Sequence, residues 1–267
     1  MAPRPRLSPR LRVSSLRPLR RRGLPFVVTR PVSCSPADVF RVRWAAMGFL
    51  NLRSRRDIRR LQKRLPALAD YDQKAEAGRQ RLAEEHQRYV TSVSTEAAAA
   101  SLETSVFLWV LCDALQPRRI ADLGSGFSSY LFRTWAQQAS APAEVWSADD
   151  DPEWLARTAA FLQSHDLETR RLLSWEAFTA EDRGTFDLVF HDLGSMPTRV
   201  RTFGQAILLA GDAGAVLLDD VHKRKKYRQF ARDELLRLGR DSYDLKSLLQ
   251  DRYGRYAWLV LRPEEKG

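Results

Sequence analysis

Residues 119–129 read RIADLGSGFSS, and this stretch decides the fold of the chain. A short apolar run ends at Asp122, and the glycine turn Gly124-Ser125-Gly126 follows two residues later. The residues after the turn, SSYLFRTWAQQ (128–138), are compatible with a helix. A strand, a tight glycine turn and a helix start, in this order, form the unit with which α/β proteins cradle a nucleotide-like cofactor.

The acid just before the glycines, Asp122, distinguishes between two kinds of cofactor. A dinucleotide brings its pyrophosphate to this turn, and a carboxylate would repel it, whereas a ligand with an amino group and a sulfonium would be attracted. The dinucleotide fingerprint also needs a third glycine for close packing of helix and strand, and this chain has Ser129 there. The turn therefore resembles motif I, (D/E)-x-G-x-G, of the class I S-adenosylmethionine-dependent methyltransferases.

Strand-like and helix-like segments alternate after the glycine turn. Apolar runs predict strands near 119–123, 144–149, 170–175, 186–191 and 214–219. Helices are expected between them, near 127–138, 152–164, 197–209 and 222–238. This alternation is typical of a parallel sheet covered by helices on both faces.

The end of the chain breaks the alternation. Two strand-like runs, 243–249 and 256–261, follow each other with no helix expected between them, which predicts an antiparallel hairpin. The sequence thus predicts an α/β fold over 117–263, a seven-stranded, mostly parallel, doubly wound sheet with an antiparallel C-terminal hairpin. Such a sheet is similar to that of the class I methyltransferases, whose last strand runs antiparallel.

Two helical segments precede this domain and make residues 47–116 a helical N-terminal extension. In the first, 51–92, an amphipathic stripe predicts a solvated helix that packs one edge on the domain, and a dimerisation arm is the alternative. The second, 96–115, is apolar enough to be buried, and Gln116-Pro117 ends it. The oligomeric state stays open at this stage.

Positive charge is concentrated at the front of the chain. Residues 1–70 hold 18 Lys and Arg against 3 Asp and Glu, whereas the other 197 residues hold 26 against 30. Residues 1–46 contain 11 arginines and seven prolines with one acid, so we expect a basic, disordered tail. This tail fits an organelle transit peptide, an arm for nucleic acid or an anionic surface, or an upstream extension of a protein that starts near Met47.

The two cysteines and the hydropathy pattern bear on the compartment. Cys34 and Cys112 form neither a CxxC pair nor a metal-ligand spacing, so a reducing, cytoplasmic setting is the default expectation. The apolar stretch after Arg21-Arg22 is too short for a signal peptide. No window approaches 18 apolar residues, so we expect no membrane-spanning helix.

Candidate cofactor-binding residues stand at the carboxyl ends of the first two strands, where such sheets bind ligands. At the first strand these are the residues of the glycine turn and the following helix start: Asp122, Gly124, Ser125, Gly126 and Ser128. The N–H groups and the dipole at this helix start suit the methionine carboxylate of S-adenosylmethionine. At the second strand, the resemblance implies that Asp149 accepts hydrogen bonds from both ribose hydroxyls and that Asp150 lies near the adenine edge.

Asp151 and Pro152, which follow Asp150, fit a helix N-cap and first-turn proline, which is a structural role. The end of the third strand supplies two further residues on the expected adenine side. Trp175 and Glu176 end the third strand. The resemblance implies that Glu176 binds the adenine amino group, and the aromatic Trp175 can stack on the adenine ring. The alternative for Trp175 is a place in the core.

The fourth and fifth strands end in the candidate catalytic residues. Asp192 follows the fourth strand, and Asp219, Asp220 and His222 follow the fifth. The three acids resemble the Asp…Asp-Asn set that binds Mg²⁺ in catechol-type O-methyltransferases, with Asp220 in place of Asn. Mg²⁺ is therefore a candidate cofactor, and direct orientation of a substrate hydroxyl is the alternative. His222 is the candidate general base, because its unperturbed pKa lies near working pH.

A basic run, residues 223–226, follows His222 directly. Cations in the first turn of a helix oppose the helix dipole, so the run suggests an anionic group on the substrate, although a solvated helix face is the ordinary explanation.

Taken together, the residues predict S-adenosylmethionine-dependent O-methylation of a small hydroxylated metabolite or a sugar. The chain lacks the (N/D)-P-P-(Y/F) signature of base methylation on exocyclic amines, and neither cysteine ends a strand. Three alternatives stay open: an RNA methyltransferase that uses the basic front, an NAD-dependent oxidoreductase, and a binding protein of the same fold without activity.

Overall fold

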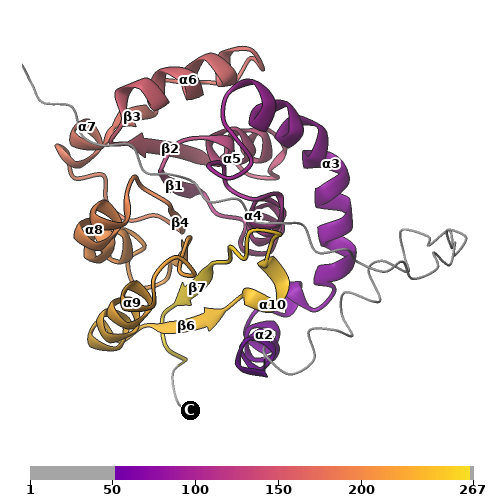
Figure 1. Cartoon of the computed structure of the whole chain (residues 1–267), viewed down its shortest axis with the longest axis vertical. Helices are drawn as coiled ribbons and strands as arrows, with labels where there is room; N and C mark the ends of the chain where they lie inside the picture. Colours follow the sequence, from indigo (N-terminus) through magenta and orange to yellow (C-terminus); the bar gives the residue numbers. More distant parts are fainter. Residues whose placement is uncertain (1–51, 265–267) are drawn as a thin grey trace, which may run out of the picture. The chain divides into compact units, whose positions relative to one another are not determined.

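The computed structural model describes residues 52–264. Contacts divide the chain into two units, residues 1–46 and residues 47–267. The expected basic tail and Cys34 lie outside the described residues. Figure 1 shows the described part of the second unit in colour, and its helices and strands form a helix-covered sheet.

A seven-stranded sheet with the order β3-β2-β1-β4-β5-β7-β6 is the framework of this unit. Its strands are β1 (Arg119–Leu123), β2 (Glu144–Asp149), β3 (Leu172–Ser174), β4 (Leu188–His191), β5 (Ala215–Leu218), β6 (Asp241–Asp244) and β7 (Trp258–Leu261). The first five strands pair in parallel, and β7 pairs antiparallel with both β5 and β6. The predicted α/β sheet with its antiparallel end is confirmed.

Helices cover both faces of the sheet. The crossover helices of the first half are α5 (Phe127–Gln138) and α6 (Pro152–Gln163), and those of the second half are α8 (Met196–Leu209) and α9 (Lys225–Arg237). The two halves run towards opposite edges of the sheet, and right-handed crossovers therefore place their helices on opposite faces. Figure 1 shows α8 and α9 on the left of the strands.

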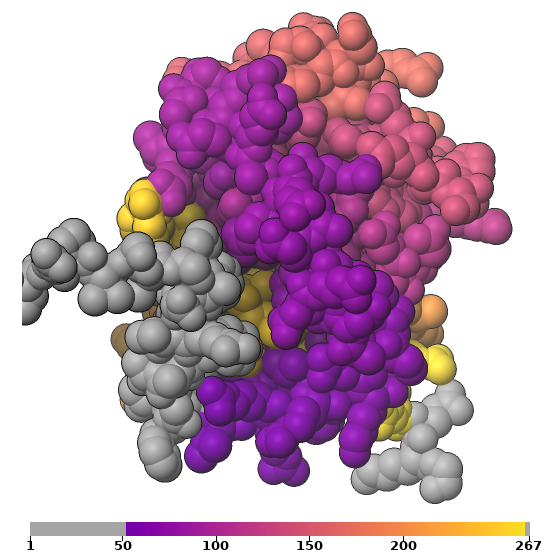
Figure 2. Space-filling view, turned by 90° about the vertical axis from the view of Figure 1, so that its right-hand side faces the viewer, coloured from indigo at the N-terminus to yellow at the C-terminus, as the bar shows by residue number. Residues whose placement is uncertain are grey.

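The helices ahead of the sheet are α2 (Leu52–Arg64), the short helix η1 (Pro66–Leu68), α3 (Tyr71–Ser92) and α4 (Leu102–Leu115). The expected helix over 51–92 is thus divided, because Pro66 has no N–H to continue it. Residues 104–112 of α4 are buried, as the apolar sequence predicted. Figure 2 shows the first helices, in purple, covering the side of the unit that lies to the right in Figure 1.

Several boundaries differ from the sequence prediction, and hydrogen bonds explain three of these differences. The α4 helix begins at Leu102 rather than at residue 96, because the Ser101 hydroxyl accepts a hydrogen bond from the Thr104 N–H (3.1 Å) and caps it. The β3 strand ends at Ser174, whose hydroxyl accepts from the Ala177 N–H (3.1 Å) and begins the helix α7 (Trp175–Thr179).

The predicted strand over 243–249 is the third difference, and it is wrong beyond residue 244. Strand β6 ends at Asp244, and a short helix, α10 (Lys246–Leu249), follows it. The Ser54 hydroxyl donates to the Asp244 carbonyl (2.7 Å) and accepts from the Ser247 N–H (2.8 Å). A contact from α2, 190 residues away in the sequence, therefore fixes this turn.

Within residues 52–264, no helix has both the length and the apolar character needed to cross a membrane.

Candidate functional site

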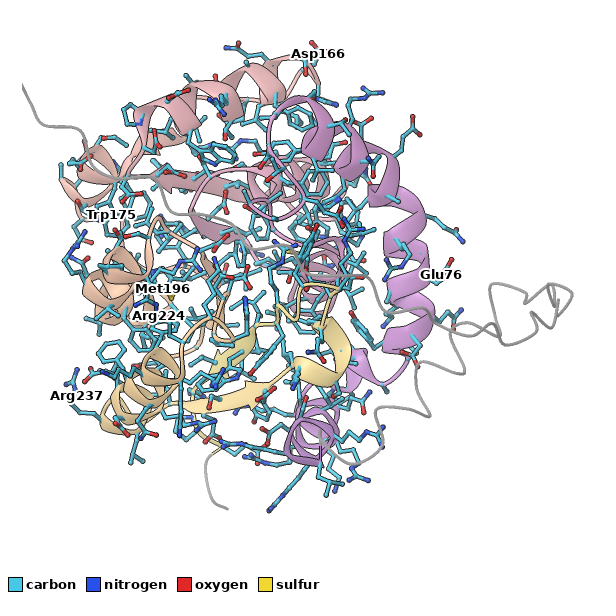
Figure 3. The ribbon with its side chains drawn as sticks, viewed as in Figure 1. Glu76, Asp166, Trp175, Met196, Arg224 and Arg237 are labelled. Atoms are coloured by element: carbon cyan, nitrogen blue, oxygen red, sulfur yellow. The ribbon has the colours of Figure 1, made fainter. Side chains whose placement is uncertain are left out.

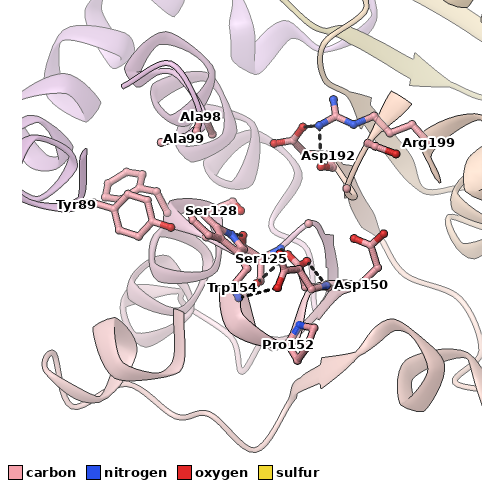
Figure 4. A pocket seen from close by; sticks show the side chains of 18 residues that line it. Tyr89, Ala98, Ala99, Ser125, Ser128, Asp150, Pro152, Trp154, Asp192 and Arg199 are labelled. Carbon is pink, nitrogen blue, oxygen red and sulfur yellow. Dashed lines mark hydrogen bonds and ion pairs between the residues drawn. The ribbon is translucent and has the colours of Figure 1, made fainter. Parts of the chain in front are cut away.

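A cavity of about 590 Å³ lies where strands β1, β2 and β4 end, which is where a ligand binds in this type of sheet. Its volume falls within the range of small-molecule sites, roughly 300–1,000 Å³. Figure 4 shows the side chains around it. The lining residues are Tyr89, Ala98, Ala99, Ala100, Gly124, Ser125, Gly126, Phe127, Ser128, Asp149, Asp150, Asp151, Pro152, Trp154, Asp192, Gly194, Ser195 and Arg199.

The glycine turn brings the end of β1 against the end of β4. Gly124 has φ +106°, and a Cβ there would lie 2.6 Å from the carbonyl oxygen of Asp192. Only glycine combines this backbone conformation with so close an approach. The turn therefore places Asp192 beside the start of α5, and both border the cavity.

Asp149 ties the end of β2 to the same turn. Its carboxylate accepts hydrogen bonds from the Ser125 N–H (2.7 Å), the Ser125 hydroxyl (3.0 Å) and the Asp151 N–H (3.0 Å). Burial raises the pKa of Asp149 to about 6, although these hydrogen bonds oppose the shift. Asp149 lines the cavity, so its oxygens are placed where a polar ligand could reach them.

The residues after Asp149 form the floor of the cavity in Figure 4. Asp150 lies against Gly194 and accepts a hydrogen bond from the Thr198 hydroxyl (3.3 Å). Asp151 caps α6 by accepting from the N–H groups of Glu153 (2.9 Å) and Trp154 (3.2 Å), as the sequence predicted.

Asp122, which the sequence predicted to contact the ligand through its charge, is bound by neighbouring side chains of the same turn. The side chain is fully buried and accepts hydrogen bonds from the hydroxyls of Ser128 (2.7 Å) and Ser129 (2.5 Å). Burial raises the pKa of Asp122, and hydrogen bonds from both serines oppose this shift. The carboxylate thus fixes the start of α5 to the end of β1, and it is not among the residues that line the cavity.

Trp175 and Glu176 also lie outside the cavity lining. Trp175 begins α7 and stacks on Phe178, with ring centroids 5.9 Å apart (its place is labelled in Figure 3). Glu176 is exposed in the first turn of the same helix.

One wall of the cavity comes from residues that the sequence did not single out. Tyr89, near the end of α3, is buried, and a Cβ on Gly126 would lie 3.1 Å from its hydroxyl oxygen. Ala98, Ala99 and Ala100 belong to the segment between α3 and α4. Apolar alanines between two helical patterns give no signal of a binding role, which is why the sequence missed this wall.

Two side chains hold the alanine segment in place. Arg255 donates to the carbonyls of Ala97 (3.0 Å) and Ala99 (2.7 Å), and the carbonyl of Ala100 lies 2.9 Å from Nε2 of His86. Arg255 itself is fixed by Asp251, whose carboxylate accepts its Nε–H (2.6 Å). The wall is therefore anchored from α3 and from the segment between β6 and β7.

Arg199 lies between the acids that follow β4 and β5. Its Nη1 donates to Asp220 (2.6 Å), and its Nη2 forms an ion pair with the Asp192 carboxylate and a hydrogen bond with the Asp192 carbonyl (2.9 Å). Lys223 forms a second ion pair with Asp220. Figure 4 shows Arg199 reaching Asp192 at the edge of the cavity opposite Tyr89.

Asp219 and Asp220 differ in their electrostatic environment. Burial and the neighbouring Asp220 raise the pKa of Asp219 to about 6. Burial would also raise the pKa of Asp220, but Arg199 and Lys223 outweigh it and lower this pKa. Asp220 has φ +59°, a conformation that is uncommon outside glycine and is often found at functional sites.

The expected Mg²⁺ set does not fit a metal ion in this arrangement. The oxygens of Asp192 and Asp220 that face each other are taken by the guanidinium of Arg199. Among residues 52–264 no three His, Cys, Asp or Glu side chains gather as a metal site would require.

His222 lies close to the acids but does not line the cavity. Its Nδ1 is 3.7 Å from the Asp220 carboxylate, and its side chain is 18% exposed. Burial lowers the pKa of His222, and the charge of Asp220 opposes this effect. The basic run that follows is exposed: Lys223 pairs with Asp220, and Arg224 stands directly ahead of α9 (Figure 3).

Comparison with known proteins relates this arrangement to solved structures. Neither a protein-family model nor a curated protein matches the sequence. Cofactor-bound Rv0187 from MTB has 20% identity and a TM-score of 0.51, over 89% of this chain and 100% of the other. The S-adenosylhomocysteine-bound methyltransferase PaMTH1 of Podospora anserina has 14% identity and a TM-score of 0.52, again over 89% and 100%. The chain has the fold of the class I S-adenosylmethionine-dependent methyltransferases.

Proposed function

We propose that the chain is an S-adenosylmethionine-dependent methyltransferase that acts on a hydroxyl oxygen of a small hydroxylated metabolite or sugar. The observation that carries this proposal is the cavity at the ends of β1, β2 and β4. It joins a glycine turn, the acid Asp149 and the acid Asp192 in a sheet of the methyltransferase order. The dinucleotide alternative is disfavoured, because a dinucleotide-binding sheet has the order 3-2-1-4-5-6.

The residues on the β1 and β2 side suit S-adenosylmethionine. The N–H groups at the start of α5 and the Tyr89 hydroxyl can donate to the methionine carboxylate. Asp149 and Asp150 both line the cavity. In this proposal Asp149 accepts hydrogen bonds from the ribose hydroxyls, and Asp150 lies near the adenine edge. Trp175 and Glu176 stay proposed adenine contacts, but they carry less weight than Asp149 and Asp150 because they lie outside the cavity lining. Asp122 contributes by fixing the turn.

The residues on the β4 and β5 side suit an acceptor. When bound, the sulfonium of the cofactor supplies an already electrophilic methyl group, so the protein mainly has to align the acceptor oxygen. Alignment of this kind contributes about 7–11 kcal/mol to catalysis. Asp192 borders the cavity and is placed to orient the acceptor hydroxyl and take its proton. His222 is the second proposed base, of secondary weight, because it lies outside the cavity lining and 3.7 Å from the Asp220 carboxylate.

Titration calorimetry with S-adenosylhomocysteine and with NADH tests the proposal. We expect S-adenosylhomocysteine to bind one molecule per chain and NADH not to bind. Asp149→Asn should weaken the binding of S-adenosylhomocysteine by about 10- to 100-fold, since one charge-assisted hydrogen bond is worth about 1.5–3 kcal/mol. The control Asp233→Asn changes an exposed acid of α9 and should leave binding unchanged. Binding of NADH in place of S-adenosylhomocysteine would refute the methyltransferase assignment.

RNA is a second candidate acceptor, favoured by the sequence of α2. This helix reads LRSRRDIRRLQKR, and several of its basic side chains are exposed, Arg53, Arg56, Arg59 and Arg60 among them. Substitution of Arg56 and Arg59 by Glu tests this surface without touching the buried residues of α2. A salt-dependent RNA affinity that these changes abolish would favour the RNA acceptor, and methyl transfer to small hydroxylated compounds without RNA affinity would exclude it.

A further inference from the structure

Arg199 occupies the position in which the acids after β4 and β5 would otherwise hold a shared cation. Its Nη1 and Nη2 bind a different acid each, Asp220 at 2.6 Å and Asp192 at the carboxylate and the carbonyl. The side chain of Arg199 is 6% exposed, as is that of Asp220. A buried charge persists only when it is paired, so this guanidinium and its acids depend on one another.

The geometry is that of a bridge between two strand ends. Arg199 projects from α8, which connects β4 to β5, and it reaches back to the residue that follows β4 and across to the residues that follow β5. A planar guanidinium offers parallel N–H groups to carboxylates, which a lysine does not. The Arg199 side chain therefore joins the two strand ends at the edge of the cavity that it lines.

A second cation lies at the same place. Lys223 forms an ion pair with Oδ2 of Asp220, the oxygen that Arg199 also binds, and one oxygen of Asp219 accepts the Asp220 N–H (2.7 Å). A divalent cation needs several oxygen ligands within about 2.0–2.6 Å. It would have to displace Arg199 and Lys223 and would meet their repulsion at short range.

We infer that Arg199 is a resident cation that takes the place of a divalent metal at the acceptor end of the cavity. The role of this site in methyl transfer rests on the function proposed above. The guanidinium fixes the carboxylate of Asp192 and supplies positive charge beside the acceptor oxygen, so Arg199 acts as a positioning residue. A metal ion selects an acceptor that can chelate it with two adjacent oxygens, whereas a fixed guanidinium makes no such demand. The acceptor therefore needs only the one hydroxyl that reacts, without a second oxygen next to it.

Manganese binding tests this inference without an activity assay. The probe is Mn²⁺ alone, followed by electron paramagnetic resonance of the free ion and by calorimetry on the full-length protein. We expect no stoichiometric binding to the wild type. Arg199→Ala should gain one Mn²⁺ per chain, and addition of Asp192→Ala, which removes a carboxylate that Arg199 holds, should abolish that gain. Arg199→Lys keeps a cation and should exclude Mn²⁺ like the wild type, and Arg201→Ala, which changes an exposed arginine of the same helix, is the control.

Two results would overturn the inference. One is stoichiometric Mn²⁺ binding to the wild type that Asp192→Ala removes. The other is a folded Arg199→Ala protein, judged by circular dichroism, that gains no Mn²⁺. If Arg199→Ala does not fold, Mn²⁺ binding is measured on the wild type and on Lys223→Ala, whose lysine is 45% exposed. Both proteins keep Arg199, so neither should bind Mn²⁺, and stoichiometric binding to either would contradict the inference.

S-adenosylhomocysteine titration of the same wild-type sample separates this inference from the proposed function. Absence of S-adenosylhomocysteine binding would refute the proposed function, while a gain of Mn²⁺ on removal of Arg199 would still establish the resident cation.

Discussion

The guanidinium of Arg255 donates a hydrogen bond of 2.7 Å to the carbonyl oxygen of Ala99, which lies 156 positions earlier in the chain. This contact fastens a wall of the cavity to the far end of the sheet. Because Arg255 also binds the carbonyls of Ala97 and Glu96, several hydrogen bonds depend on one side chain.

Arg255→Lys should weaken the binding of S-adenosylhomocysteine by about tenfold, because lysine cannot bind several carbonyls in one plane and each lost bond is worth about 1 kcal/mol. Calorimetry measures the change. Arg170→Lys, at an exposed position, is the matched control. Unchanged affinity in Arg255→Lys would mean that the alanine segment holds its place without this anchor.

Gly124→Ala should lower the free energy of unfolding by about 3 kcal/mol, because φ is +106° and the new methyl group would meet the backbone of Asp192. Urea denaturation gives this value. Gly204→Ala is the control, since Gly204 lies within α8 with open space around its Cβ position and the change should be neutral or stabilise by up to about 1 kcal/mol. Equal effects of the two substitutions would contradict the close approach of β1 and β4.

Cofactor affinity should depend on pH through Asp149. Burial raises its pKa to about 6 in the folded protein, so the carboxyl is protonated below that pH. Ribose hydroxyls donate best to the ionised form. Affinity for S-adenosylhomocysteine should therefore rise as the pH increases through about 6, with a limiting slope of roughly tenfold per pH unit below the pKa.

Calorimetry between about pH 5 and 7.5 measures this dependence, and Asp149→Asn should remove it. A slope that persists in Asp149→Asn would assign the titration to another group.

Asp122→Asn separates a structural carboxylate from one that meets the ligand. Because Asp122 is fully buried and accepts from Ser128 and Ser129, the substitution should cost about 2 kcal/mol of folding stability. Affinity for S-adenosylhomocysteine should fall by less than about fivefold, as the turn is only loosened. The opposite pattern, with stability kept and affinity lost, would restore the direct contact that the charge of Asp122 suggested.

Local sequence predicted the first half of the sheet closely. The bounds expected for 119–123, 127–138 and 144–149 are those of β1, α5 and β2. In this region the glycine turn and the apolar periodicity lie within a few residues of each other, so the local sequence is enough to determine where each element begins and ends. The antiparallel pairing of β7 was predicted from the change of pattern near the C-terminus and is confirmed.

Features that depend on contacts between residues far apart in the chain could not be predicted from the local sequence pattern. The helix α10 depends on Ser54, and the alanine wall depends on Arg255. Nothing in the local sequence MPTRVRTF distinguishes Arg199 from its neighbour Arg201, yet only Arg199 lies buried between two acids. The charge of Asp122 pointed to the right fold, but the sequence did not indicate that the hydroxyls of Ser128 and Ser129 would donate to its oxygens.

The position of β7 between β5 and β6 has a consequence for biosynthesis. Until residues as far as Leu261 have emerged from the ribosome, β5 is an unpaired edge with a buried-type sequence, AVLL. Exposed apolar edges invite pairing with other nascent chains. A chain that is released before β7 has been synthesised would therefore contain the five parallel strands, β1 to β5, and would tend to aggregate through the unpaired edge of β5.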